Sequence, residues 1–171
     1  MKKIIISLLC IVLSASIASA TLLPEGTSEL ALSGLVDFDT ASGTQIDLSV
    51  FYGYFVQDLL QGGLKLSLYN DDDYTGWSIG PRVEQNFDIG TELAPFAAAS
   101  LVFTTIDGPA GYGDKNAFIL GVEGGAKYFI TEYFAISGAL VLELATDKIY
   151  RSDSDTKRHD IRLEFGVRTY F

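Results

Sequence analysis

The sequence predicts an all-β protein that folds as an eight-stranded antiparallel up-and-down transmembrane β-barrel. Three observations predict this fold. Apolar residues alternate with polar or small ones, the alternating segments are long for a soluble sheet, and charge falls on one face of each segment. Although the 171-residue chain is 48% hydrophobic, beyond its N-terminus it has no apolar run of the roughly 18 residues that a transmembrane helix requires. The apolar residues therefore follow a pattern that is typical of β-strands and not of a transmembrane helix.

The N-terminus predicts a cleaved Sec signal peptide over residues 1–20, which leaves a single barrel domain over residues 21–171. Two lysines supply positive charge, residues 4–12 are apolar apart from one serine, and Ala18-Ser19-Ala20 offers small residues for cleavage. Cys10 lies within the apolar run and does not follow a small residue, which argues against a lipoprotein. Because Cys10 leaves with the signal, the mature chain has no cysteine for a disulfide, a thiolate nucleophile or a zinc site.

The alternation is clearest in the last segment, where Ile161, Leu163 and Phe165 alternate with Arg162 and Glu164. Similar segments occur around residues 30–38, 46–54, 64–69, 77–87, 118–129 and 134–145. An eighth, alanine-rich segment over 92–105 has no readable register. In the seven readable segments, one face contains no Asp, Glu, Lys or Arg. A basic residue at the middle of a bilayer costs roughly 2–4 kcal/mol, so this sorting favours a lipid-facing exterior.

The predicted connections alternate between short and long. Tight turns are expected at residues 57–60, 88–91 and 130–132, and longer or more polar loops at 39–44, 70–75, 106–114 and 146–158. Short turns and both termini belong on the periplasmic side of such barrels, and longer loops on the outside. Pro81 lies within a predicted strand and removes a ladder hydrogen bond, so we expect a bulge or kink there.

Two parts of the chain carry a family resemblance: the terminal strand, which ends in Phe171, and the segment Gly124-Gly125-Ala126-Lys127-Tyr128-Phe129-Ile130. Through them the mature chain resembles the small outer-membrane β-barrel superfamily, which includes the membrane domain of outer-membrane protein A, OmpX and the opacity-like adhesins. The resemblance implies a Gram-negative outer-membrane location. It also implies that Phe165, Val167 and Phe171 form the C-terminal signal recognised by the barrel-assembly machinery.

The expected partners follow from location and charge. Outer-membrane lipid and lipopolysaccharide surround such a barrel, and we expect a monomer. Loss of the two signal-peptide lysines changes the formal charge from −10 to −12, which makes nucleic acid an unsuitable partner.

The interior of an eight-stranded barrel is only wide enough to hold side chains. Here the inward face carries acidic and basic groups together, Asp47 among them. The residues predicted to form a lumen ion-pair network are Lys65, Arg82, Glu84, Glu123, Lys127, Glu143, Arg162, Glu164 and Arg168. Two interpretations remain open: a plug of satisfied ion pairs that rigidifies the barrel, or an ion path with a gate. Glu143 and Arg162, on adjacent strands, are the predicted pair to test first.

No catalytic, cofactor or metal site is predicted. The single histidine, His159, begins the last strand, and the residues two positions away are Lys157 and Ile161, so the Ser–His spacing of a lipid A deacylase is missing. Residues 71–76 resemble the start of an EF-hand loop, but the twelfth position is Arg82, which cannot bind calcium.

The sequence therefore predicts a non-enzymatic outer-membrane barrel with a structural or surface-interaction role, a plugged lumen and four short extracellular loops. Three alternatives remain: a narrow porin-like channel, a soluble periplasmic ligand-binding β-barrel and a lipid-modifying barrel enzyme. The soluble alternative predicts an apolar interior and a polar exterior, which is the reverse of the sorting proposed above.

Overall fold

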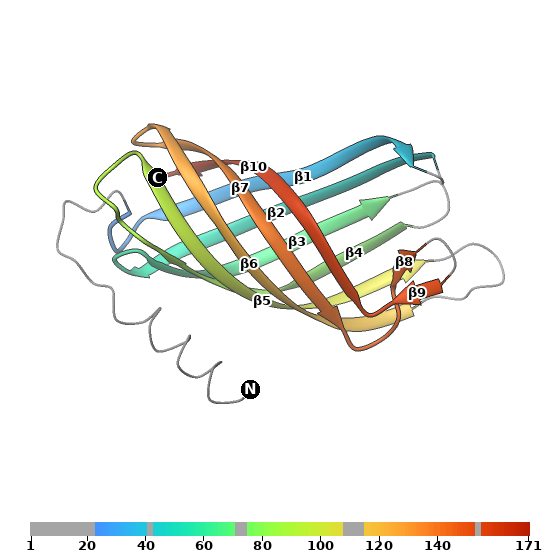
Figure 1. Cartoon of the computed structure of the whole chain (residues 1–171). Helices are drawn as coiled ribbons and strands as arrows, with labels where there is room; N and C mark the ends of the chain where they lie inside the picture. Colours follow the sequence, from blue (N-terminus) through green and yellow to red (C-terminus); the bar gives the residue numbers. More distant parts are fainter. Residues whose placement is uncertain (1–22, 41–42, 71–74, 108–114, 153–154) are drawn as a thin grey trace.

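The computed structural model is a closed barrel of eight antiparallel strands (Figure 1). It describes residues 23–40, 43–70, 75–107, 115–152 and 155–171. The predicted signal peptide over residues 1–20 and most of the acidic loop over 71–76 lie outside the described residues. Within the described ranges, no helix is both long and apolar enough to cross a membrane.

Consecutive strands are neighbours around the wall, and the last strand closes the barrel against the first. The barrel strands are β1 (Ser28–Thr40), β2 (Gly43–Gln57), β3 (Leu60–Asn70), β4 (Thr75–Asn86), β5 (Leu93–Asp107), β6 (Lys115–Thr131), β7 (Phe134–Ala145) and β10 (His159–Tyr170). A separate hairpin of β8 (Tyr150–Ser152) and β9 (Asp155–Lys157) lies between β7 and β10. The predicted eight-stranded up-and-down barrel is confirmed.

The exterior of the wall is apolar, and the interior is largely polar. Exposed outward side chains include Leu32, Leu48, Leu66, Ile79, Leu101, Leu120, Leu142 and Phe165. Buried inward side chains include Ser49, Lys65, Arg82, Ser100, Glu123 and Arg168. The faces predicted from the alternation are confirmed wherever the structure describes the side chains. A soluble ligand-binding barrel would need the opposite arrangement, so that alternative is contradicted.

The structure also supplies the register of the alanine-rich strand β5. Ala94, Phe96 and Ala98 are buried inside the barrel, whereas Leu93 and Leu101 are exposed outside. Ala98 pairs with Glu84 on β4 and with Glu123 on β6. Its small side chain therefore leaves room in the lumen for the long charged side chains on both sides.

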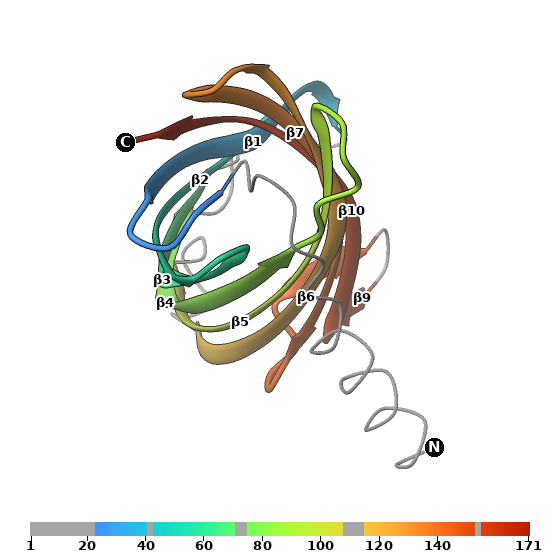
Figure 2. The same ribbon diagram turned by 90° about the vertical axis from the view of Figure 1, so that its left-hand side faces the viewer.

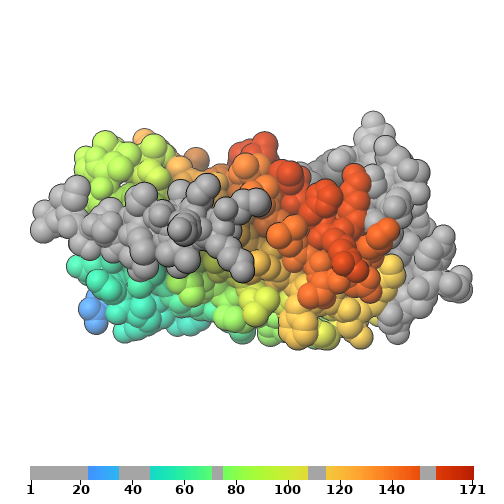
Figure 3. Space-filling model, turned by 60° about the horizontal axis from the view of Figure 1, so that its bottom comes forward, coloured from blue at the N-terminus to red at the C-terminus, as the bar shows by residue number. Residues whose placement is uncertain are grey.

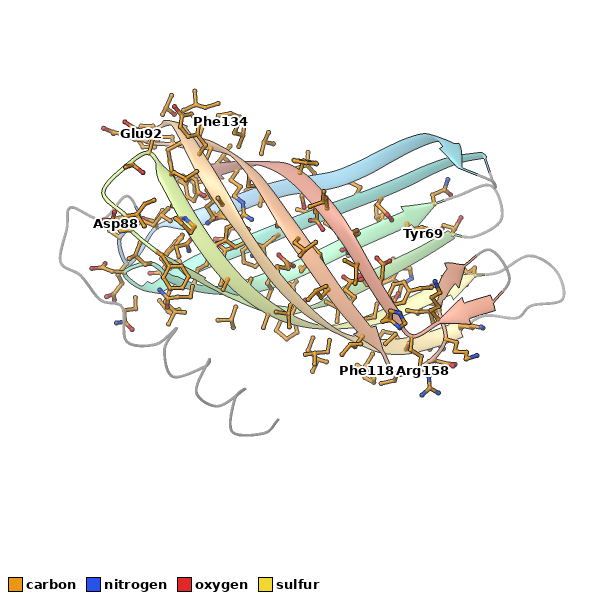
Figure 4. The ribbon with its side chains drawn as sticks, in the orientation of Figure 1. Tyr69, Asp88, Glu92, Phe118, Phe134 and Arg158 are labelled. Atoms are coloured by element: carbon orange, nitrogen blue, oxygen red, sulfur yellow. The ribbon has the colours of Figure 1, made fainter. Side chains whose placement is uncertain are left out.

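The connections distinguish the two ends of the barrel. The barrel end at which β1 begins and β10 ends also carries the short connections β2–β3, β4–β5 and β6–β7, and is called the turn end below (Figure 1). In Figure 4, Asp88, Glu92 and Phe134 lie at this end. Tyr69, Phe118 and Arg158 lie at the opposite end, called the loop end.

Two predicted loops at the loop end differ in the structure. The prediction of a loop over 39–44 was wrong in extent, because β1 runs to Thr40 and β2 begins at Gly43. Polar residues can continue the ladder there because β-pairing uses backbone groups and does not depend on an apolar side chain. The predicted loop over 146–158 contains the β8–β9 hairpin.

The expected bulge at Pro81 is absent. Pro81 pairs with Leu64 on β3, and the β4–β5 register is the same at Ile79↔Phe103 as at Arg82↔Ser100. Only the pairings of Gly80 and Pro81 with β5 are missing. The proline ring is exposed on the lipid-facing side, so the strand tolerates a lost hydrogen bond without an inserted residue.

Candidate functional site: the charged lumen

Seven charged side chains gather inside the barrel near its turn end and are called the inner cluster. They are Glu29 on β1, Lys65 on β3, Arg82 and Glu84 on β4, Glu123 and Lys127 on β6, and Arg168 on β10. Their side chains are between 0 and 8% exposed. Figure 2, which faces the turn end, shows that these strands lie on different sides of the barrel wall. The cluster therefore crosses the lumen.

Glu84 is the centre of the inner cluster. Its carboxylate lies 2.7 Å from the Arg82 Nη2, 2.5 Å from the Lys127 Nζ and 3.0 Å from the Arg168 Nη1. Glu29 lies opposite and accepts hydrogen bonds from Lys127 at 2.8 Å and Arg168 at 2.6 Å. Two carboxylates thus share two cations, so each charge has more than one partner, as burial requires.

Glu123 extends the inner cluster toward the loop end. It accepts hydrogen bonds from Arg82 Nη2 at 2.7 Å and from Lys65 Nζ at 3.0 Å. Aromatic rings supply further contacts for the guanidinium groups, whose central carbons lie 4.5 Å (Arg82) and 4.7 Å (Arg168) from the centres of Phe51 and Phe96. Cation–π attraction adds to ion pairing where water is excluded.

A second group near the loop end is called the outer cluster and consists of Glu143, Asp160, Arg162 and Glu164. Arg162 forms a bidentate ion pair with Glu143, at 2.7 and 2.8 Å, and also contacts Asp160 at 3.0 Å. Its Nη2 is 3.8 Å from Glu164, which accepts a hydrogen bond from the Ser33 hydroxyl. The Arg162 side chain is 24% exposed, so this cluster is less sheltered than the inner one.

The β8–β9 hairpin packs against the loop end of the lumen. Ile149 and Tyr150 contact the buried side chains of Val102, Ile119 and Ala145. In Figure 3, the orange and red atoms of the β7–β10 connection lie against the yellow ends of β5 and β6. The Tyr150 hydroxyl donates to Glu143 at 2.9 Å. Burial and the neighbouring carboxylate raise the pKa of Tyr150 above its usual range, so the hydroxyl keeps its proton at neutral pH.

An apolar group closes the turn end. It consists of Leu23, Phe55, Leu59, Ala94, Phe129, Ala135 and Tyr170. Leu23 is fully buried, and its carbonyl accepts a hydrogen bond from the Leu59 N–H at 3.0 Å. The segment before β1 is thus part of the barrel floor, and water access from this end is restricted.

The structure places all nine residues of the predicted network on the inward face, but in two separate groups. The sequence reasoning missed Glu29, Gln61 and Asp160. Gln61 donates to both Glu29 and Glu84, at 3.0 and 2.6 Å. Each missed residue continues the inward alternation of its strand by two or four positions, so extending that alternation toward the strand ends would have found all three.

The other candidate residues lie on the outside. Phe165, Val167 and Phe171 are 65%, 39% and 68% exposed on the outer face. His159 is exposed at the start of β10. Among the described residues, no group of three His, Cys, Asp or Glu side chains could hold a metal ion.

Comparison with known proteins identifies the fold. No family model and no curated protein sequence matches the chain. Solved structures do match. Neisserial surface protein A is 19% identical with a TM-score of 0.64, and the match covers 86% of this chain and 98% of that one. The N-terminal β-barrel domain of Pseudomonas aeruginosa OprF is 20% identical with a TM-score of 0.63 and the same coverages, 86% and 98%.

The outer membrane protein OprG from Pseudomonas aeruginosa is more distant in sequence. It is 11% identical, the TM-score is 0.55, and the match covers 89% of this chain and 99% of that one. All three matches span nearly the whole of the solved chain. The protein therefore has the fold of the small eight-stranded β-barrels of Gram-negative outer membranes, and its apolar outer wall fits that location.

Proposed function

We propose that the protein is a non-enzymatic outer-membrane β-barrel with a structural or surface-interaction role, whose lumen is closed by a plug of ion pairs. The observation that carries the proposal is the inner cluster. Its seven buried charges bridge strands on different sides of the wall and occupy the lumen. In this role the ion pairs fix the barrel's shape, and the loop end displays its four connections at the cell surface.

The proposed partners are those of a membrane-embedded monomer. The apolar wall would contact outer-membrane lipid and lipopolysaccharide, and the outward Phe165, Val167 and Phe171 would form the signal for the barrel-assembly machinery. The Ser–His pattern of a lipid A deacylase has no support at His159, because Ile161 stands two positions after it on the same face.

Membrane fractionation tests the location and the fold. The full precursor would be expressed in a Gram-negative host, and the outer-membrane fraction compared on a denaturing gel with and without boiling. We expect the protein in that fraction, with a mobility shift on boiling. A soluble periplasmic protein without the shift would refute the proposal.

A narrow channel is the second candidate, and the partial exposure of Arg162 favours it. Planar-bilayer recording separates the two functions. A plug predicts no unitary conductance steps from the purified protein. Steps that change in size in Glu143→Gln or Arg162→Met would instead establish a channel through the outer cluster.

A further inference from the structure

The seam between the first and last barrel strands is paired over only part of its length. From the turn end, the β1–β10 ladder runs as far as Gly34↔Phe165 and stops there. Toward the loop end both strands continue, and each keeps its ladder with its other neighbour, β2 or β7. Figure 1 shows the two ribbons diverging over this part. Residues 35–40 of β1 and 159–164 of β10, all within the described strands, therefore do not pair with each other.

The interior is more accessible along β10 where this pairing ends. The exposed fractions of its inward side chains increase from the turn end to the loop end, with 8% for Arg168, 11% for Glu164, 24% for Arg162 and 35% for Asp160. Inward side chains near the loop end of β5, β6 and β7 remain buried, namely Thr104, Ala117 and Ala145. The exposure therefore follows the unpaired seam and not the distance from the turn end.

The unpaired part of β10 has a free backbone edge on the lipid-facing wall. Ser28 and Phe171 exchange both backbone hydrogen bonds across the seam, at 2.8 and 3.0 Å. Every second residue of an antiparallel strand directs its backbone groups to the same neighbour, so those of Leu163 and Ile161 point toward β1. Their side chains are 60% and 64% exposed on the outer wall. Hydrocarbon offers no hydrogen-bond partner to such groups, which favours pairing of the seam.

The register already present defines a closed state of the seam. If the ladder continued one residue for one residue beyond its present end, Val36 would pair with Leu163 and Asp37 with Arg162. An apolar pair and a pair of opposite charges both stabilise adjacent antiparallel strands. The two unpaired segments are therefore complementary to each other in sequence.

One position opposes closure. The same register would place Asp39 of β1 opposite Asp160 of β10, and like charges directly opposite each other are destabilising. Asp160 also accepts a hydrogen bond from Arg162 at 3.0 Å in the open seam, and this guanidinium would have to serve Asp37 as well after closure. Closure therefore gains backbone hydrogen bonds but brings two carboxylates together, and this balance permits two states.

We propose that residues 35–40 and 159–164 form a lateral gate in the loop-end half of the wall. Open, as in the structure, the gate gives polar headgroups of the surrounding lipid sideways access to the outer cluster. Closed, the β1–β10 ladder extends to the loop end and separates that cluster from the lipid. The inner cluster lies nearer the turn end and keeps the rest of the lumen shut in both states. The gate rests on the proposed membrane location but goes beyond the structural role.

Disulfide trapping tests the gate, because residues 21–171 contain no cysteine. Val36→Cys/Leu163→Cys, the gate pair, would be treated with a membrane-permeable oxidant in outer membranes, and the remaining thiols counted by mass-tagging after denaturation. The matched control is Leu32→Cys/Val167→Cys, whose positions are partners in the paired part of the seam. We expect the gate pair to oxidise completely but at least about tenfold more slowly than the control, because a minor state is roughly 0.1–10% populated.

Two results of this experiment would overturn the proposal. Equal rates in the two pairs would show that the seam is always closed, and the absence of a disulfide in the gate pair would show that it never closes. A chain that failed to form a barrel would also lack the disulfide of the control pair, so the gate and the fold are tested separately. If the gate pair does not fold, Phe38→Cys/Ile161→Cys, two positions nearer the loop end in the same register, replaces it.

The opposed carboxylates provide a second test. Asp160→Asn, added to the gate pair, removes one of the two charges and should make oxidation about twofold to fivefold faster. Asp147→Asn is the control, because Asp147 is exposed in the connection after β7, and it should leave the rate unchanged. An equal rate with and without Asp160→Asn would overturn the proposed balance between the open and closed states.

Discussion

The inner and outer clusters use the same kinds of side chain in different surroundings. The inner cluster joins residues far apart in the chain, such as Glu29 with Lys127 and Arg168, and its side chains are at most 8% exposed. The outer cluster joins the adjacent strands β7 and β10, and Arg162 and Asp160 are 24% and 35% exposed. Burial therefore decides how much an ion pair contributes to the stability of the barrel.

The reason is the balance between desolvation and attraction. Removing one member of a buried pair leaves its partner without water or counter-charge, whereas solvent partly replaces the lost member of an exposed pair. Disruption of the inner cluster should therefore cost the barrel more stability than disruption of the outer cluster.

The largest effect is expected from Glu84→Gln in the inner cluster. The substitution keeps the shape of the side chain but removes the charge shared by Arg82, Lys127 and Arg168. The free energy of unfolding, measured by urea denaturation of the protein in lipid vesicles, should fall by about 3–5 kcal/mol. A loss below about 1 kcal/mol would mean that the inner cluster is not the stabilising plug.

The apolar floor should be the next most sensitive region. Leu23→Ala removes a fully buried side chain beside Phe55 and Leu59, and should lower the free energy of unfolding by about 2–4 kcal/mol. Ile130→Ala is the control, because Ile130 is 56% exposed on the outer wall. Equal losses in the two variants would contradict a role for Leu23 in closing the turn end.

The outer cluster should respond less, and its response should depend on salt. Arg162→Met is expected to lower the free energy of unfolding by about 1–2 kcal/mol. Arg162 is 24% exposed, so water can reach the space that it leaves, and the buried Glu143 keeps its hydrogen bond from the Tyr150 hydroxyl. Raising the salt concentration from 0.05 to 0.5 M should shrink this loss but leave that of Arg168→Met nearly unchanged. Similar salt responses would remove the proposed distinction between the clusters.

The smallest effect concerns the hairpin at the loop end. Tyr150→Phe deletes only the hydroxyl that donates to Glu143, which should weaken the hairpin contact by about 0.5–1.5 kcal/mol. Trypsin cleavage after Lys157 or Arg158 should then become roughly threefold to tenfold faster, while the barrel remains folded. Tyr133→Phe is the control because Tyr133 is 67% exposed. Trypsin should cleave this variant after Lys157 or Arg158 at the same rate as the wild type.

Local sequence patterns predicted most of the wall. Ile161, Leu163 and Phe165 alternate with charged residues, and this period of two directly specifies which side chains face lipid. Strand β5 was different, since alanines on both of its faces leave no local pattern to read. The extent of β1 and β2 was also missed, because polar strand residues beyond the lipid look like a loop in sequence.

The sequence by itself determined the inward position of the charged residues, because the face of a strand residue depends only on its parity along the chain. Only the tertiary structure decided which charges meet. Glu29 lies beside Arg168 and Lys127, and Arg82 beside Glu123, because closure of the barrel and the stagger of its strands bring distant positions to the same level of the lumen. That stagger is a property of the whole ring of strands, and no single segment encodes it.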